Sequence, residues 1–166
     1  MDNFQITEDF DLYQLTGSRD HPELVQANRE YFIQEPYLTR LRVATEFGPQ
    51  QIQDELKAGP YSEKMFELVV LNGGRYPKLN EAVGGAPLSQ HQFRIKGDGA
   101  FDFYVPGMDI FEVEHIIRWR LGLAFHQLRV YKWDPKLKRG NFIHFGMPLG
   151  WNDMRIDYPY GGKGSG

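Results

Sequence analysis

The chain has 166 residues, of which 41% are hydrophobic and 25% are charged, and its formal net charge at pH 7 is −3. These values are typical of one globular domain with a sizeable core, and the slight acidic excess argues against a nucleic-acid partner, which usually requires a basic excess. No apolar run approaches the roughly 20 residues that span a membrane, and the lack of cysteine excludes disulfides, thiolate nucleophiles and cysteine–zinc sites.

The two ends of the chain differ in composition. The N-terminal residues MDNFQITEDF are acidic and lack the basic-then-apolar order of a signal peptide, so we expect synthesis in the cytoplasm without an export signal. The sequence has no internal repeat and no long linker, which predicts a single domain over residues 1–158. Residues 159–166 are rich in glycine and predict a flexible tail.

Helical patterns dominate the first half of the chain. Residues 22–58 carry apolar side chains at helical spacing, and Pro49 interrupts this pattern at a position suited to the first turn of a further helix. Residues 66–71 form a short, nearly continuous apolar run that predicts a buried strand. Residues 77–83 suit one or two helical turns.

The second half of the chain contains strand patterns and one clear helix. Residues 100–105 and 127–133 predict strands, and residues 142–145 predict a strand that returns after a turn. Residues 106–122 predict an amphipathic helix that Asp109 can cap. This order of elements, with helices first and then strands around one helix, predicts an α+β fold with a small, mainly antiparallel sheet and flanking helices.

Alternation along two of these strands predicts that a carboxylate and an imidazole share one sheet face. If the aromatic residues around Asp102 face the core, Asp102 faces the other side, and the same holds for His144 between its apolar neighbours. His91 precedes the Asp102 strand by a loop that could curl back over the same face. Two imidazoles and one carboxylate suit a catalytic zinc with a fourth, open position. The alternative is three ordinary hydrogen-bonded polar residues.

A longer sequence pattern supports the hypothesis that these residues bind a metal ion. Residues 68–91 read LVVLNGGRYPKLNEAVGGAPLSQH, and residues 105–107 (VPG) and 142–144 (FIH) follow later in the chain. This pattern resembles the zinc D-alanyl-D-alanine carboxypeptidase and L,D- and D,D-endopeptidase family, which has the hedgehog/DD-peptidase fold and includes many phage lysins. The resemblance covers roughly residues 5–148.

The resemblance implies a specific site and activity. His91, Asp102 and His144 match the family's three zinc ligands, so it implies Zn²⁺ as the cofactor. Arg75 matches the arginine that binds the substrate's carboxylate or carbonyl, a task for which its planar, bidentate donor group is suited. We therefore expect a phage-encoded peptidase that hydrolyses the peptide stems or cross-bridges of bacterial peptidoglycan, reaching the cell wall through phage lysis or within a virion. Neither a nucleic acid nor a membrane is expected as a partner.

Two departures from the family pattern concern the proton carrier and a loop. The general base of the family has two usual positions, and here they hold Asn141 and Gly146, neither of which accepts a proton near pH 7. His126 is the remaining candidate, because its ordinary pKa is near 6.5; its other interpretation is a polar residue at a strand end. The segment between His91 and Asp102 is longer than in the family, so Asp98 either enters the site or caps its own turn.

These departures also favour a second interpretation. The chain could be a non-catalytic virion protein of a phage tail or capsid, which reuses the peptidase fold to bind other phage structural proteins. A metal site that opens to a cleft would favour the peptidase. A cleft plugged by residues 92–99 would favour the structural protein.

Overall fold

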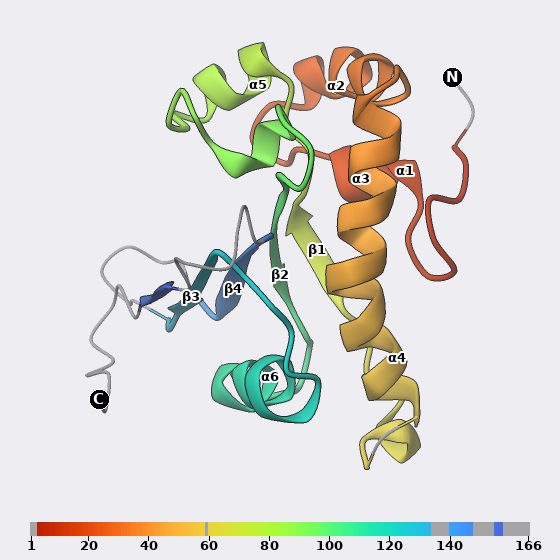
Figure 1. The fold of residues 1–166 in the computed structure, drawn as a ribbon, viewed down its shortest axis with the longest axis vertical. Helices are drawn as coiled ribbons and strands as arrows, with labels where there is room; N and C mark the ends of the chain where they lie inside the picture. The colour runs from red at the N-terminus through yellow and green to blue at the C-terminus, as the bar shows by residue number, and fades with distance from the viewer. Residues whose placement is uncertain (1–2, 59, 134–139, 148–154, 158–166) are drawn as a thin grey trace.

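The computed structural model describes residues 3–58, 60–133, 140–147 and 155–157. It has the predicted α+β architecture, in which helices flank a small sheet whose main strands are antiparallel (Figure 1). The predicted tail, 159–166, and most of the predicted turn before residue 142 lie outside the described residues. Within the described part of the chain, no helix has both the length and the apolar character needed to cross a membrane.

The N-terminal half is helical, as predicted. Its elements are α1 (Leu12–Thr16), α2 (Val25–Phe32), α3 (Tyr37–Thr45) and α4 (Gln51–Ala58), with 3₁₀ turns at Pro22–Leu24 and Ser62–Lys64. Asp11 begins α1 with a capping box, because its side chain accepts from Gln14 N at 2.8 Å while the Gln14 side chain accepts from Asp11 N at 2.7 Å.

The interruption predicted at Pro49 takes a different form. α3 and α4 are joined by one π-helical turn, Glu46–Gln50, which contains Pro49, so the helical path continues (Figure 1). A wider turn of this kind accommodates a proline, which lacks the N–H that the regular helical ladder needs. The further helix predicted after the interruption is present as α4, but Pro49 lies in the π-helical turn that precedes it rather than in its first turn.

The sheet has five strands in the order β1-β2-β4-β3-β5. Their bounds are β1 (Val69–Asn72), β2 (Ala100–Tyr104), β3 (Gln127–Tyr131), β4 (Phe142–Gly146) and β5 (Arg155–Asp157). The first four pair antiparallel, and β5 adds to β3 in parallel. The strand predicted at 66–71 starts three residues later than expected, and β5 was not predicted.

Three shorter helical elements lie among the strands. They are α5 (Pro77–Ala82), the 3₁₀ turn Gln90–Gln92 and α6 (Ile110–His115). The helix predicted over 106–122 is shorter: α6 begins after Asp109, whose side chain accepts from Phe111 N at 2.9 Å, and it continues as a π-helical turn to Arg120. Gly122, with φ +59, follows the last turn, as expected of a residue that ends a helix.

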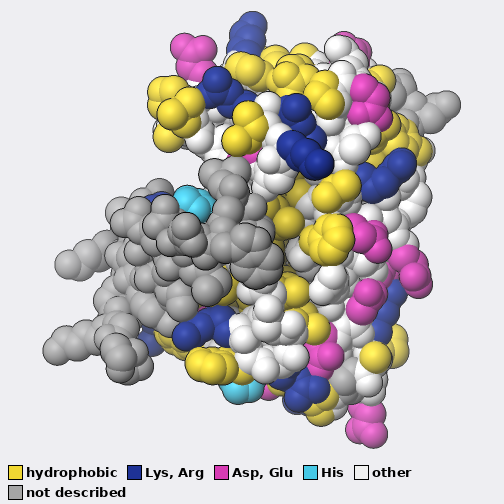
Figure 2. Space-filling model, viewed as in Figure 1, with side chains coloured by type: hydrophobic (Ala, Val, Ile, Leu, Met, Phe, Trp, Pro, Cys, Tyr) yellow, Lys and Arg dark blue, Asp and Glu magenta, His cyan; other side chains and the backbone are white. Residues whose placement is uncertain are grey.

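The core lies on one face of the sheet, against the helices. The inward residues of the three central strands are at most 2% exposed: Phe101, Phe103, Leu128, Val130, Ile143 and Phe145. The predicted alternation is thus confirmed, and the opposite face is left for polar side chains. On the outside, apolar side chains stay exposed along α3 and the turn after it, where Val43 is 47% and Phe47 57% exposed (Figure 2).

Candidate metal centre

One row of polar residues crosses the sheet at the site. Asn72 pairs with Asp102, Asp102 with His144, and His144 with Arg129, on β1, β2, β4 and β3 in turn. Residues that pair directly across antiparallel strands project from the same face. The sheet therefore brings Asp102 and His144 together on the face opposite the core, as the alternation predicted.

His91 reaches this row from the 3₁₀ turn Gln90–Gln92. Ser89 caps the turn by accepting from His91 N at 3.4 Å, and Arg75 N donates to His91 O at 2.7 Å. The ring atom Nδ1 of His91 lies 2.8 Å from the carbonyl oxygen of Gly73. A carbonyl can only accept, so Nδ1 carries the proton and Nε2 is left with its lone pair, on the side of Asp102.

The glycine pair after β1 explains how that carbonyl comes within reach of His91. A Cβ on Gly73 would lie 2.3 Å from Leu15 O, and a Cβ on Gly74 would lie 2.5 Å from the Phe32 ring. Only glycine allows the backbone to pass this close to α1 and α2. The close passage places Gly73 O within hydrogen-bond distance of His91 Nδ1, so the helical layer helps to orient a residue of the site.

We expect Gly73→Ala to disturb stability and the site together. The added Cβ would overlap a backbone oxygen that cannot rotate away, so the free energy of unfolding should fall by about 1–3 kcal/mol. The displaced carbonyl should also lower the affinity of the site for a metal ion roughly 10-fold, as loss of a hydrogen-bond partner of a ligand usually does. Urea denaturation and a chelator competition measure the two effects, and unchanged values in both would contradict this account.

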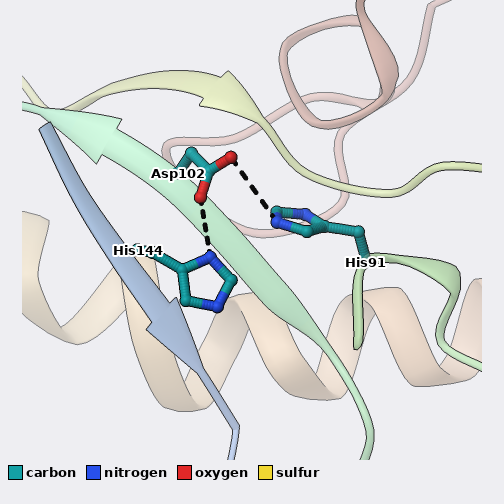
Figure 3. Close-up of side chains that lie close together, drawn as sticks. All are labelled: His91, Asp102 and His144. Carbon is teal, nitrogen blue, oxygen red and sulfur yellow. Dashed lines mark hydrogen bonds and ion pairs between the residues drawn. The ribbon is translucent and has the colours of Figure 1, made fainter. Parts of the chain in front are cut away.

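The three side chains converge as Figure 3 shows. His144 Nδ1 lies 2.8 Å from Asp102 Oδ1, and His91 Nε2 lies 3.5 Å from Asp102 Oδ2. One nitrogen or oxygen atom from each of the three residues lies within 4.8 Å of the others. His91 and Asp102 are buried, with 4% and 8% exposure, and His144 is half-buried. Residues far apart in the chain thus form one compact polar group.

Two further side chains hold the Asp102 carboxylate. Oδ2 accepts from Asn72 Nδ2 at 3.1 Å and from Arg75 Nη2 at 3.3 Å. Burial by itself would raise the pKa of Asp102, but the electrostatic interactions with the His91 and His144 rings outweigh burial and hold the pKa well below its usual range. Asp102 is therefore an ionised carboxylate at neutral pH.

Burial has the opposite effect on the pKa of the neighbouring His91. It lowers the pKa of His91, although the Asp102 carboxylate opposes that shift, so His91 favours the neutral form. An ionised carboxylate and a neutral imidazole are the protonation states that a metal ion needs in its ligands.

The residues present fit a zinc ion. Ligand atoms that surround zinc tetrahedrally at 2.0–2.2 Å are about 3.4 Å apart, so a pair at the limit of 4.8 Å needs to close by about 1.4 Å. The contacts of Gly73 O with His91, and of Asn72 and Arg75 with Asp102, are of the kind that orients metal ligands. The group could therefore hold a metal ion.

The group opens to a cleft of about 440 Å³. Its lining residues are Arg75, Val83, Gly84, Gly85, His91, Asp102, Arg129, Tyr131, Phe142 and His144. Tyr131 and Phe142 stack at 4.4 Å between ring centroids and form a flat apolar wall. The cleft thus combines a mainly polar lining with one aromatic pair.

The long loop after His91 does not line this cleft. Residues 96–98 border a separate pocket against α3, and Arg40 on α3 donates to Phe93 O at 2.9 Å and to Arg94 O. Asp98 accepts from Arg94 N at 3.2 Å and from Gly99 N at 3.1 Å, so it caps its own turn rather than entering the site. In the described part of the chain, residues 92–99 do not plug the cleft.

The positions considered for a general base give no proton carrier in the cleft. Asn141 accepts from Trp133 N at 3.0 Å and borders a different pocket, and a Cβ on Gly146 would lie 2.3 Å from Gln90 Oε1, so Gln90 fills that space. His126 precedes β3 and donates its backbone N–H to Gly146 O at 2.8 Å, but it does not line the cleft. Among the described lining residues, Asp102 is the sole carboxylate.

We expect His126→Gln to change any hydrolysis by less than about threefold. Removing a general base usually lowers the rate by about 10²–10⁴-fold, and His126 lies outside the residues that line the cleft. Initial rates of amine release at several pH values measure the effect. A loss of about 100-fold or more would instead identify His126 as the base.

Two members of the site were missed at the level of sequence. Asn72 and Arg129 belong to the polar row across the sheet and contact or border the metal-binding group. Arg129 could have been predicted, because it stands between the apolar residues Leu128 and Val130 in the alternating pattern of β3. Asn72 could not be found in this way, because the register between β1 and β2 shifts between Val70 and Asn72.

No family model matches the chain, and neither the curated proteins nor the solved structures contain a significant match.

Proposed function

We propose that this chain is a zinc-dependent peptidase with a hedgehog/DD-peptidase-like fold, encoded by a phage, that hydrolyses the peptide stems or cross-bridges of bacterial peptidoglycan. The observation that carries the proposal is the convergence of His91, Asp102 and His144 on one face of the sheet, at an open cleft. The same three residues stand at the ligand positions of the family pattern that roughly residues 5–148 resemble.

Each residue has a task that its chemistry suits. His91, Asp102 and His144 would hold the ion, which supplies a Lewis acid that polarises the scissile carbonyl and activates water. Arg75 borders the cleft and contacts Asp102, so its guanidinium can orient that ligand while presenting its other N–H groups to a peptide carbonyl or carboxylate. The stacked rings of Tyr131 and Phe142 offer an apolar wall to the peptide.

A second function is favoured by one observation. Apart from Asp102, the described residues that line the cleft include no carboxylate that could serve as a general base. A metal-binding module without a proton carrier would suit a phage tail or capsid protein that binds other phage structural proteins without hydrolysing them. The two functions share the metal site and differ in catalysis.

Amine release from purified peptidoglycan distinguishes the two functions. The zinc-loaded protein is incubated with cell-wall sacculi beside a known peptidoglycan peptidase, and new amino groups are measured with a fluorogenic reagent. We expect release that stops with a chelator and in His144→Ala, and that returns with added zinc in the wild type alone. Stoichiometric zinc without amine release would support the virion protein. A protein that binds no zinc would overturn the peptidase.

A further inference from the structure

A second pocket lies next to the metal-binding cleft, and we call it the Trp133 pocket. On three neighbouring strands, a residue that lines the cleft lies within two positions of one that lines this pocket. The pairs are Asp102 and Tyr104 on β2, Phe142 and Asn141 at the start of β4, and Tyr131 and Trp133 at the end of β3. Because β2 and β3 both run antiparallel to β4, the three steps from cleft to pocket lead in the same direction.

The Trp133 pocket borders the sheet face that carries the metal-binding group. Phe103 and Val105 are 0% and 3% exposed in the core. Tyr104 stands between them, so it projects from the same face as Asp102. Residues two positions apart along a strand are about 7 Å apart, so the pocket begins about 7 Å from the backbone of Asp102. One ligand can therefore occupy the cleft and the pocket together.

The wall of the Trp133 pocket is largely apolar, and its volume is about 460 Å³. Trp133 is 51% exposed and Leu71 is 43% exposed at its border. Large apolar side chains that stay exposed together indicate an interaction site, and a volume of this size is within the usual range for small ligands. The indole ring of Trp133 offers a flat apolar surface to such a ligand.

Two polar side chains of the pocket keep hydrogen-bonding atoms for a ligand. Asp109 Oδ1 accepts from Phe111 N at 2.9 Å, and Asn141 Oδ1 accepts from Trp133 N at 3.0 Å. These bonds fix both side chains at the pocket and use one oxygen of each. The second carboxylate oxygen of Asp109 can accept, and the amide nitrogen of Asn141 can donate. Asp109 is the one charged residue among the described lining residues, so the pocket disfavours an anionic ligand.

A neutral pyranose ring has the chemistry that these groups recognise. One face of such a ring presents C–H groups, which pack against a flat aromatic side chain. Its edge carries hydroxyl groups, each of which can both donate and accept a hydrogen bond. A carboxylate that only accepts, next to an amide nitrogen that only donates, is therefore matched by neighbouring hydroxyl groups on one ring.

We infer that the Trp133 pocket binds a neutral sugar ring of the glycan to which the stem peptide is attached. The ring would pack on Trp133 and Tyr104, with its hydroxyl groups on Asp109 and Asn141. This inference rests on the proposed function and deepens it, because it narrows the substrate to stem peptides that still carry their sugar. At about 3.3 Å per residue, the ring and the carbonyl at the metal-binding group would be separated by at least about two residues of extended chain.

The test compares three forms of one stem tetrapeptide: free, linked to its disaccharide, and capped with a cyclohexyl group that has a six-membered ring but no hydroxyl groups. Isothermal titration calorimetry in equimolar zinc should show the disaccharide form bound about 10-fold more tightly than the free form, the scale of one aromatic contact with a hydrogen bond. The cyclohexyl form should gain less than about threefold. Equal affinity for the free and disaccharide forms, binding of neither, or equal affinity for the cyclohexyl and disaccharide forms would overturn the inference.

A second tryptophan provides the matched control. Trp133→Ala should remove the preference for the disaccharide form, and Trp133→Phe, which keeps a flat ring, should retain part of it. Trp119 is 69% exposed on the π-helical turn after α6 and does not line the pocket, so Trp119→Ala should keep the full preference. Zinc affinity, thermal stability and affinity for the free peptide should stay at wild-type values in Trp133→Ala. An unchanged preference in that variant would show that the sugar binds elsewhere and would overturn the inference.

Hydrolysis of the free and disaccharide forms separates the inference from the proposed function. If the wild type prefers the disaccharide form but releases no amine from either, the peptidase proposal fails and the sugar-binding pocket stands. If it hydrolyses both forms with the same kcat/KM and binds both equally, the peptidase proposal stands and the sugar-binding pocket is overturned.

Discussion

Zinc affinity is expected to fall by at least about 100-fold in His91→Ala and in His144→Ala. Loss of a group that merely orients a ligand costs about 10–100-fold, so loss of a ligand should cost more. The protonation states of the site support binding in the wild type, because burial keeps His91 neutral while Asp102 stays ionised. Competition with a chromophoric zinc chelator at pH 7.5 gives the affinities directly.

A histidine outside the site provides the matched control. His115 is exposed on α6, and His115→Ala should bind zinc like the wild type. His91 is buried and bonds to Gly73 O, so the folding of His91→Ala must be checked by circular dichroism. The half-buried His144 gives a second variant with less risk to the fold. Wild-type zinc affinity in a folded His144→Ala would contradict the assigned metal centre.

Phe101→Ala is expected to lower the free energy of unfolding by about 3–5 kcal/mol, the usual range for a buried phenylalanine. Phe101 is 0% exposed, packs edge-on against Phe93 at 5.8 Å between ring centroids, and pairs with Phe145 across β2 and β4. Truncation would leave a cavity between the sheet and the loop that carries His91. Urea denaturation measures the change.

The control for this prediction is an exposed phenylalanine. Phe47 is 57% exposed, so Phe47→Ala should change the free energy of unfolding by about 0.5 kcal/mol or less. Excess zinc should also stabilise the weakened variant, because a ligand that binds only the folded state shifts the folding equilibrium towards it. A loss below about 1 kcal/mol in Phe101→Ala would mean that this core can collapse around the missing ring.

Local patterns predicted the parts of the site that lie on regular strands. Asp102 and His144 each stand between apolar neighbours, and a strand with one buried face must turn such residues to its other face. The α+β class followed from the same periodicities. The helix over 106–122 was predicted in type but not in extent, because the change to a π-helical turn after His115 leaves no mark in hydrophobic spacing.

Contacts between distant segments could not be predicted in this way. The hydrogen bond from His91 to Gly73 depends on how closely the backbone after β1 passes Leu15 and Phe32. The turn that holds Asp98 packs on α3 through Arg40, which chain length alone does not indicate. These features arise from packing between layers, and packing depends on the whole core rather than on a local window.

The amino-acid order alone was enough to indicate the fold class, the sheet face of Asp102 and His144, and the residue types of a metal centre, since each depends on side-chain chemistry or on a period of a few residues. The three-dimensional arrangement was needed to bring His91 to that face and to add Asn72 and Arg129 to the site. It also showed that Gln90 occupies the space beside Gly146. Strand order and register join residues that are remote in the chain, and no local pattern carries that information.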